Sequence, residues 1–149
     1  KFDNPLICSS YYPWRLCDAA AANGRVDLLE WAVRLGKKFS SRSFALAAGG
    51  GHLNCLDWLY ANQCKMNGTA SEAAAREGKM EALVWLKEKN CPFDVSATNA
   101  AAREGRLGVL RFLCVIECPM NEWTHAIAVG RQDEEMVKFL VESGCPRFP

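Results

Sequence analysis

The apolar positions of this chain recur every 27 residues, and each 27-residue row carries the spacing of two helices. In row 94–120, the segment 95–104 is rich in alanine, and the segment 106–116 places leucine, valine and phenylalanine at helical intervals. Three of the repeating apolar columns are Trp31, Trp58, Trp85, Phe112 and Phe139; Leu29, Leu56, Leu83, Leu110 and Val137; and Ala20, Ala47, Ala74, Ala101 and Ala128. This agreement between rows predicts about five similar stacked units. The aromatic column is expected to lie in their core, with a stacking platform for bases or sugars as the alternative.

Polar and glycine columns predict where the helices begin and end. The column before each first helix holds the N-cap residue types Ser40, Asn67, Asp94 and Asn121. The column of Gly24, Gly51, Gly78 and Gly105 suits the left-handed conformation that ends a helix. The second helices are expected to end at Gly36, Gln63, Asn90, Glu117 and Gly144, close to the prolines at 92, 119 and 146.

The pattern therefore predicts an all-α solenoid of helix-turn-helix units joined by short turns. The repeat domain is expected over 13–149, with repeats at about 13–39, 40–66, 67–93, 94–120 and 121–147. Residues 1–12 do not fit the repeat, and we expect them to form an N-terminal arm that either covers the first repeat or docks onto another subunit. The last repeat replaces the recurring glycine with Gln132 and continues with Asp133, Glu134 and Glu135, which suits a polar terminal cap.

Four of the eight cysteines also keep the 27-residue period, as Cys64, Cys91, Cys118 and Cys145. Stacked helices lie about 10 Å apart, whereas a disulfide needs Cα atoms within about 7 Å. Equivalent cysteines in neighbouring units are therefore expected to be small buried thiols, with redox or metal chemistry as the alternative. Free buried thiols favour a reducing intracellular compartment, most simply the cytoplasm.

The composition and the motifs offer little chemistry. The net charge of +1 gives no strong attraction to nucleic acid, and no apolar run of about 18 residues predicts a membrane span. The two histidines, His52 and His125, fall in different columns, and Gly49–Gly51 lacks the Lys-Ser or Lys-Thr of a P-loop. Cys114 and Cys118 could face together on one helix, but no further residue completes a metal site. We therefore expect no enzymatic activity, no cofactor and no metal.

The segments AANGRVDLLEWA, AAGGGHLNCLDWL and AREGRLGVLRFL resemble the ankyrin-repeat signature, and the resemblance covers about residues 13–147. The endings CPFD and CPMN are similar to shortened ankyrin-like repeats in arrays from protists, algae and large DNA viruses. Two features depart from the standard repeat: the period is 27 instead of about 33, and the Thr-Pro-Leu-His tetrapeptide is absent. The missing residues fall where ankyrins carry a β-hairpin, so short turns are expected in its place.

The resemblance implies protein–protein binding through a concave face lined by the slim first helices. The best candidates are positions that vary between rows on that face: Arg42, Glu72, Arg76, Glu77, Asn99, Arg103, Glu104, Trp123 and Arg131. Trp123 is expected to be an exposed aromatic residue and a hot-spot candidate, because its equivalents are Arg or small polar residues. The alternative is that the charged residues are simply solvated. We expect an adaptor or scaffold that is a monomer alone or a subunit of a hetero-complex; the alternative is a structural subunit embedded permanently in a larger assembly.

Overall fold

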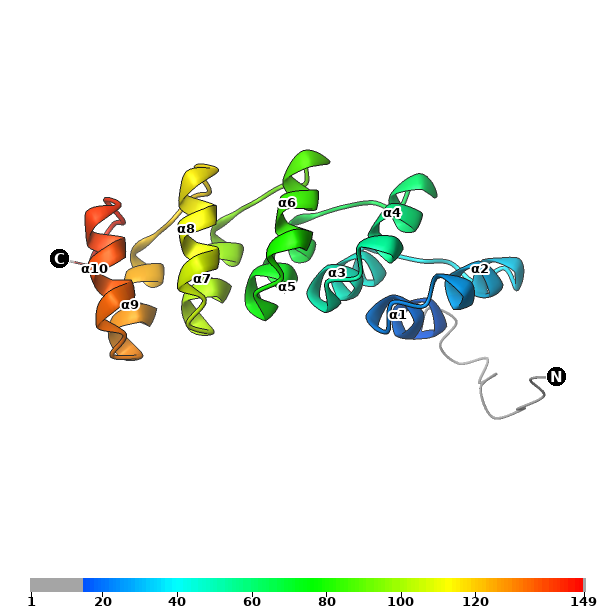
Figure 1. The fold of residues 1–149 in the computed structure, drawn as a ribbon, viewed down its shortest axis with the longest axis horizontal. Coiled ribbons are helices and arrows are strands. Elements are labelled where there is room, and N and C mark those ends of the chain that lie inside the picture. The colour runs from blue at the N-terminus through cyan, green and yellow to red at the C-terminus, as the bar shows by residue number, and fades with distance from the viewer. Residues whose placement is uncertain (1–14, 149) are drawn as a thin grey trace.

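The computed structural model describes residues 15–148, so the arm expected at 1–12 and the start of the first repeat lie outside the described residues. Within 15–148 the chain forms ten α-helices and no strand, and Figure 1 shows them as helix pairs standing in one row. The first helices of the pairs are α1 (Arg15–Ala22), α3 (Ser41–Gly50), α5 (Gly68–Glu77), α7 (Val95–Arg103) and α9 (Glu122–Gly130). The second helices are α2 (Val26–Arg34), α4 (Leu53–Ala61), α6 (Met80–Glu88), α8 (Leu107–Val115) and α10 (Glu134–Glu142). The predicted all-α solenoid with short turns is confirmed.

Each described N-cap column residue starts its helix as the sequence predicts. The side chains of Ser40, Asn67, Asp94 and Asn121 accept hydrogen bonds from backbone N–H groups of the first turn at 2.9–3.3 Å. Each of these residues has an extended backbone, so the side-chain oxygen lies over N–H groups that have no partner inside the helix.

The helix ends also follow the predicted columns. The four glycines that end the first helices have φ between 68° and 74°, and the non-glycine residues Gln63, Asn90 and Glu117 adopt φ of 56–58° at the ends of second helices. The following amide then turns back to the helix, as when His52 N–H donates to the Ala47 carbonyl and Cys118 N–H donates to the Leu113 carbonyl, both at 2.9 Å. These bonds satisfy carbonyls that the last helical turn leaves open.

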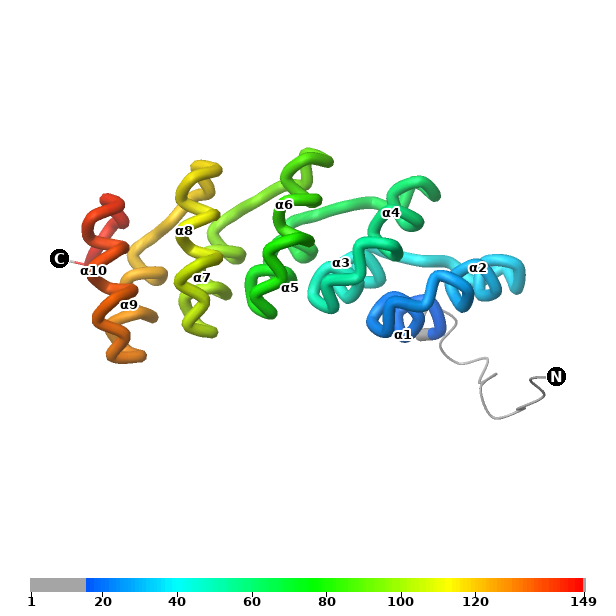
Figure 2. The backbone as a smooth tube through the Cα atoms, in the orientation of Figure 1, coloured from blue at the N-terminus to red at the C-terminus, as the bar shows by residue number. Residues whose placement is uncertain are grey.

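The core of the stack is a row of alanines between first helices and a row of leucines beneath them. Ala20, Ala47, Ala74, Ala101 and Ala128 are at most 1% exposed, and Leu29, Leu56, Leu83 and Leu110 are fully buried. Neighbouring first helices pack closely along their length, whereas neighbouring second helices barely meet. The first helices therefore lie closer to one another than the second helices do. Along the stack, each helix pair is rotated relative to the pair before it (Figure 2).

The tryptophan column is buried only where a preceding unit covers it. Trp85 is 9% exposed and Trp58 is half-buried, as the core interpretation predicts. Trp31 is 43% exposed, so the core interpretation is wrong at that position: among the described residues no helix pair stands in front of α1 and α2. None of the helices in 15–148 combines the length and apolar character needed to cross a membrane.

Replacing Ala74 with leucine should lower the free energy of unfolding by about 1–3 kcal/mol, because the added carbons have no room between α5 and its neighbours. The exposed Ala61 at the end of α4 offers a matched control, where leucine should change stability by less than about 0.5 kcal/mol. Urea unfolding of both variants tests this, and an unchanged midpoint for Ala74→Leu would contradict close packing of the first helices.

Replacing Glu117 with glycine should raise the free energy of unfolding by about 0.5–1 kcal/mol, because its left-handed backbone strains a residue that carries a Cβ atom. Glu117→Ala keeps the Cβ atom and should give no such gain. Thermal and urea unfolding of the two variants provide the comparison, and an equal gain in both would assign the effect to charge removal instead.

Candidate functional site

The nine candidate residues lie on the exposed side and the ends of the first helices. Positions two, five and nine after the N-cap fall within an arc of about 60° on a helix, and position ten lies next to them at the helix end. In these positions stand Arg42 and Trp123; Glu72 and Asn99; Arg76 and Arg103; and Glu77, Glu104 and Arg131. We call these nine residues the first-helix surface.

Trp123 is the one aromatic residue among these nine. Its side chain is 61% exposed, and its ring meets Phe148 edge to face, with centroids 5.3 Å apart and an interplanar angle of 83°. Phe148 is itself 52% exposed. Sequence reasoning did not single out Phe148, because it falls in the N-cap column of the following row and has no aromatic equivalent.

Arg42 has a second role that the sequence analysis missed. Its Nε lies 3.3 Å from Oδ2 of Asp18, while the Ser43 hydroxyl donates to Oδ1 of the same carboxylate at 2.6 Å. Asp18 is only 8% exposed, so these two donors hold a nearly buried charge at the junction between the first two units. The Arg42 side chain remains 78% exposed and can still meet a partner.

The Asp18–Ser43 contact is one instance of a pairing between columns 25 residues apart. Thr124 Oγ1 donates to Oδ1 of Asn99 at 2.7 Å in the equivalent place. At the second junction the corresponding residues are Ala45 and Ala70, which are both apolar. At the third junction the corresponding residues are Glu72 and Ala97, and Glu72 forms an ion pair with Arg76 one turn further along α5. Comparing columns at this offset would have revealed that Asp18 and Asn99 serve the junctions.

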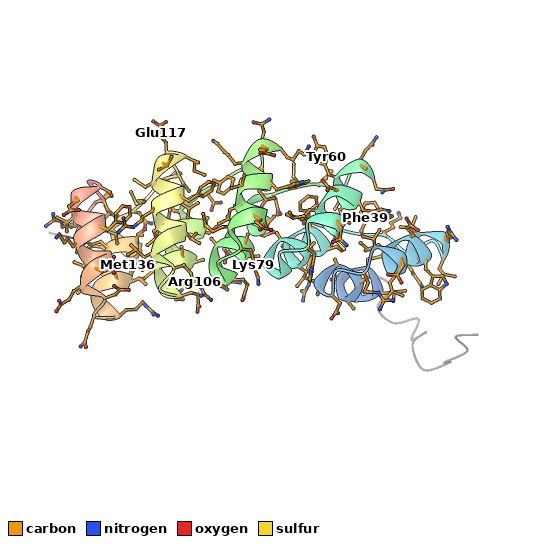
Figure 3. All side chains as sticks on the ribbon, in the orientation of Figure 1. Phe39, Tyr60, Lys79, Arg106, Glu117 and Met136 are labelled. Atoms are coloured by element: carbon orange, nitrogen blue, oxygen red, sulfur yellow. The ribbon has the colours of Figure 1, made fainter. Side chains whose placement is uncertain are left out.

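Two residues of the basic column that follows the first helices, His52 and Arg106, cap the preceding first helix. Nε2 of His52 lies 3.0 Å from the carbonyl oxygen of Ala22, which can only accept, so this nitrogen carries the proton. Arg106 Nε donates to the Arg76 carbonyl at 3.3 Å. Cations placed here also stabilise the negative end of the helix dipole. Figure 3 shows Lys79 and Arg106, from successive units, away from the edge that carries Glu117.

Arg131 performs the same capping from a neighbouring column, since its own unit has Asp133 in the basic position. Its Nη1 donates to the Arg103 carbonyl at the end of α7. Asp133 instead accepts from the Met136 N–H at 3.0 Å and starts α10. Part of the Arg131 guanidinium is therefore committed to the stack.

The repeating cysteines tie the two helices of a unit together. Each thiol donates to the backbone carbonyl of the N-cap residue 24 positions earlier: Cys64 to Ser40, Cys91 to Asn67, Cys118 to Asp94 and Cys145 to Asn121, at 3.3–3.6 Å. All four are buried and free, which confirms buried thiols without disulfides. Burial raises the pKa of Cys64, Cys91 and Cys118 to about 11.

The described residues offer no evident catalytic or metal arrangement. His125 is half-buried in α9, and no three side chains of His, Cys, Asp or Glu within 15–148 are close enough together to hold a metal ion. Cys118 bonds to the Asp94 carbonyl, while Cys114, one turn earlier on α8, is half-buried.

The arrangement of helix pairs matches a known repeat fold. The ankyrin repeat domain of human ASB11 superposes with a TM-score of 0.71 over 87% of this chain and 69% of that chain, at 23% sequence identity. The chain folds as an ankyrin-repeat-like protein. Sequence comparison by itself finds neither a matching protein-family model nor a matching curated protein. The fold confirms the resemblance carried by the Ala-Ala and glycine columns.

In this ankyrin-repeat-like stack, some side chains of the first-helix surface bond to other residues of the chain, and others do not. Arg42, Glu72, Arg76, Asn99 and Arg131 contribute to intrachain hydrogen bonds or ion pairs. Among residues 15–148, the side chains of Glu77, Arg103 and Glu104 make no hydrogen bond or ion pair, and all three are exposed. These three and Trp123 are the side chains that the fold itself uses least.

Replacing Ser43 with alanine should cost about 1–3 kcal/mol of stability, because the buried Oδ1 of Asp18 loses its hydroxyl donor. The double variant Asp18→Ala/Ser43→Ala should lose less than the sum of the single changes, since the Ala45–Ala70 junction already accepts an apolar pair. A double-mutant cycle by urea unfolding measures the coupling. Strict additivity would show that the two side chains do not interact.

Iodoacetamide at pH 8 should modify Cys114 in the folded protein and spare Cys64, Cys91 and Cys118. A thiol with a pKa of about 11 is ionised in about one molecule in a thousand at this pH, and burial blocks the reagent as well. Peptide mass spectrometry provides the measurement, and the urea-denatured chain, in which all four should react, is the control. Rapid modification of Cys118 in the native state would contradict its burial.

Proposed function

We propose that this ankyrin-repeat-like chain is a non-enzymatic protein-interaction module, an adaptor or scaffold, which holds a protein partner against the first-helix surface. The observation that carries the proposal is the exposed Trp123 on the same helical face as Arg103, a charged side chain that serves no bond within the described stack. Aromatic and arginine side chains contribute most of the binding energy in many protein interfaces.

The charges of the surface favour a polypeptide partner. Glu77, Arg103 and Glu104 mix both signs within two neighbouring units, and the whole chain carries only +1. A polyanion such as nucleic acid would meet repulsion as often as attraction here, whereas a protein surface can supply complementary charges at each position. Close alanine packing holds the first helices in place, so little ordering of this surface is needed on binding.

The second candidate is a structural subunit embedded permanently in a larger assembly. The exposure of Trp31 and Leu35 at one end, and of Val129 at the other, favours it, because neighbouring subunits would cover these apolar side chains. The two candidates use different surfaces. An adaptor depends on the first-helix surface, and an embedded subunit depends on the ends.

The double variant Arg103→Ala/Trp123→Ala should retain wild-type stability and lose at least about tenfold in affinity for its partner. Partners are captured from native extract with the full chain, identified by mass spectrometry, and then measured by titration against each variant. The matched control is Arg34→Ala/Tyr60→Ala, which removes an exposed arginine and an exposed aromatic ring from second helices. A partner that binds both variants equally well would contradict the first-helix surface and favour contacts at the ends.

A further inference from the structure

The end of α3 lacks a hydrogen bond that the equivalent helix ends make. At the ends of α1, α5 and α7, one backbone carbonyl accepts a hydrogen bond from a side chain of a later unit: Ala22 from His52, Arg76 from Arg106 and Arg103 from Arg131. Gly49 holds the same position at the end of α3, and no donor among residues 15–148 reaches its carbonyl oxygen. The α3 end is therefore the exception among these four.

The two side chains that could cap α3 from the next unit do not do so. Lys79 stands in the capping column, but its aliphatic chain lies over Gly51, where an added Cβ atom would be 3.1 Å from the lysine Cδ. Figure 3 shows Lys79 at the same edge of the stack as its equivalent in the following unit. Glu81 stands in the column of Asn54, which donates to the Gly24 carbonyl at 3.3 Å. A carboxylate accepts hydrogen bonds and cannot replace that donor.

The surroundings of the open carbonyl favour a cation. Gly49 and Gly50 have no side chains to block an approaching group, whereas the next two units carry arginine and glutamate in these columns. The Glu77 side chain lies alongside, with its Cγ 3.7 Å from the place that a Cβ atom on Gly49 would take. Glu77 is exposed and forms no ion pair within the described stack. The end of α3 adds the negative end of its helix dipole.

We propose that an arginine of the protein partner caps α3, with its guanidinium donating to the Gly49 carbonyl and pairing with the Glu77 carboxylate. The inference rests on the proposed function, because Glu77 belongs to the first-helix surface. A guanidinium carries five N–H groups in one plane, so it can donate to a carbonyl and a carboxylate at once. Arg106 and Arg131 already make the carbonyl contact at neighbouring helix ends. The partner supplies the donor that the chain does not place at α3.

Nuclear magnetic resonance of the full chain tests the cap with a defined probe, the peptide acetyl-Gly-Arg-Gly-amide. At millimolar concentration the probe should shift the carbonyl carbon signal of Gly49 in a saturable way. The carbonyl signals of Arg76 and Arg103 should not follow, because side chains of the protein already occupy these positions. Peptides with citrulline or lysine in place of the arginine should bind at least about tenfold more weakly.

The variant Lys79→Arg places a guanidinium in the capping column, where it should cap Gly49 as Arg106 caps Arg76. Its affinity for the arginine peptide should fall at least about tenfold. The matched control is Lys79→Met, which removes the ammonium group and adds no donor, so it should bind the peptide at least as tightly as the wild type. Glu77→Gln should weaken binding because the guanidinium loses its charged partner. Circular dichroism confirms that each variant is folded.

No saturable shift of the Gly49 signal in the wild-type chain overturns the proposal, including the case in which another part of the chain supplies the donor. Equal affinity of the wild type and Lys79→Arg for the peptide, or equal binding of the lysine peptide, also overturns it.

A captured partner distinguishes this proposal from the adaptor proposal. If its affinity falls in Arg103→Ala/Trp123→Ala but not in Lys79→Arg, the adaptor stands and the arginine cap is wrong. If its affinity falls in Lys79→Arg but not in Arg103→Ala/Trp123→Ala, the cap stands and the wider first-helix surface is wrong.

Discussion

The close contact between alanine-rich first helices is the constraint on which the rest of this structure depends. A methyl group at each of the positions 20, 47, 74, 101 and 128 lets neighbouring helices approach until almost no surface remains exposed. The larger leucine and aromatic side chains of the second helices keep that side of each unit wide. Repetition of this asymmetric unit determines which side of the stack is narrower and how far each unit is rotated relative to the one before it. It also determines which face of the first helices is exposed.

Polar side chains form hydrogen bonds with backbone carbonyl groups at the helix ends, which apolar packing alone would leave without partners. Thiols such as Cys118 close each unit onto its own N-cap carbonyl, and side chains such as His52 and Arg106 reach the preceding helix end. No buried side-chain nitrogen or oxygen atom within 15–148 lacks a partner. This part of the chain has no β-hairpins between its units. Short turns and side-chain caps supply the hydrogen bonds that the connections between helices need.

The same contacts separate structural side chains from those available for binding. Arg131 and Asn99 vary between rows, as a partner-binding residue would, yet both hold one unit against the next. Trp123 and Arg103 vary in the same way and contribute no side-chain hydrogen bond to the described stack. The side of the stack where the first helices are exposed therefore carries both structural side chains and side chains that remain available for binding.

The sequence by itself determined the helices, their caps, their left-handed ends and the burial of the periodic cysteines, because these depend on local spacing that repeats in every row. It also identified Trp123 as exposed. Only the tertiary structure decided that Asp18 is held by Arg42 and Ser43, that Arg131 caps α7, and that Trp31 is exposed while Trp85 is buried. The reason is physical: a column gives the direction of a side chain on its helix, whereas its partners and its burial depend on the unit that stands beside it.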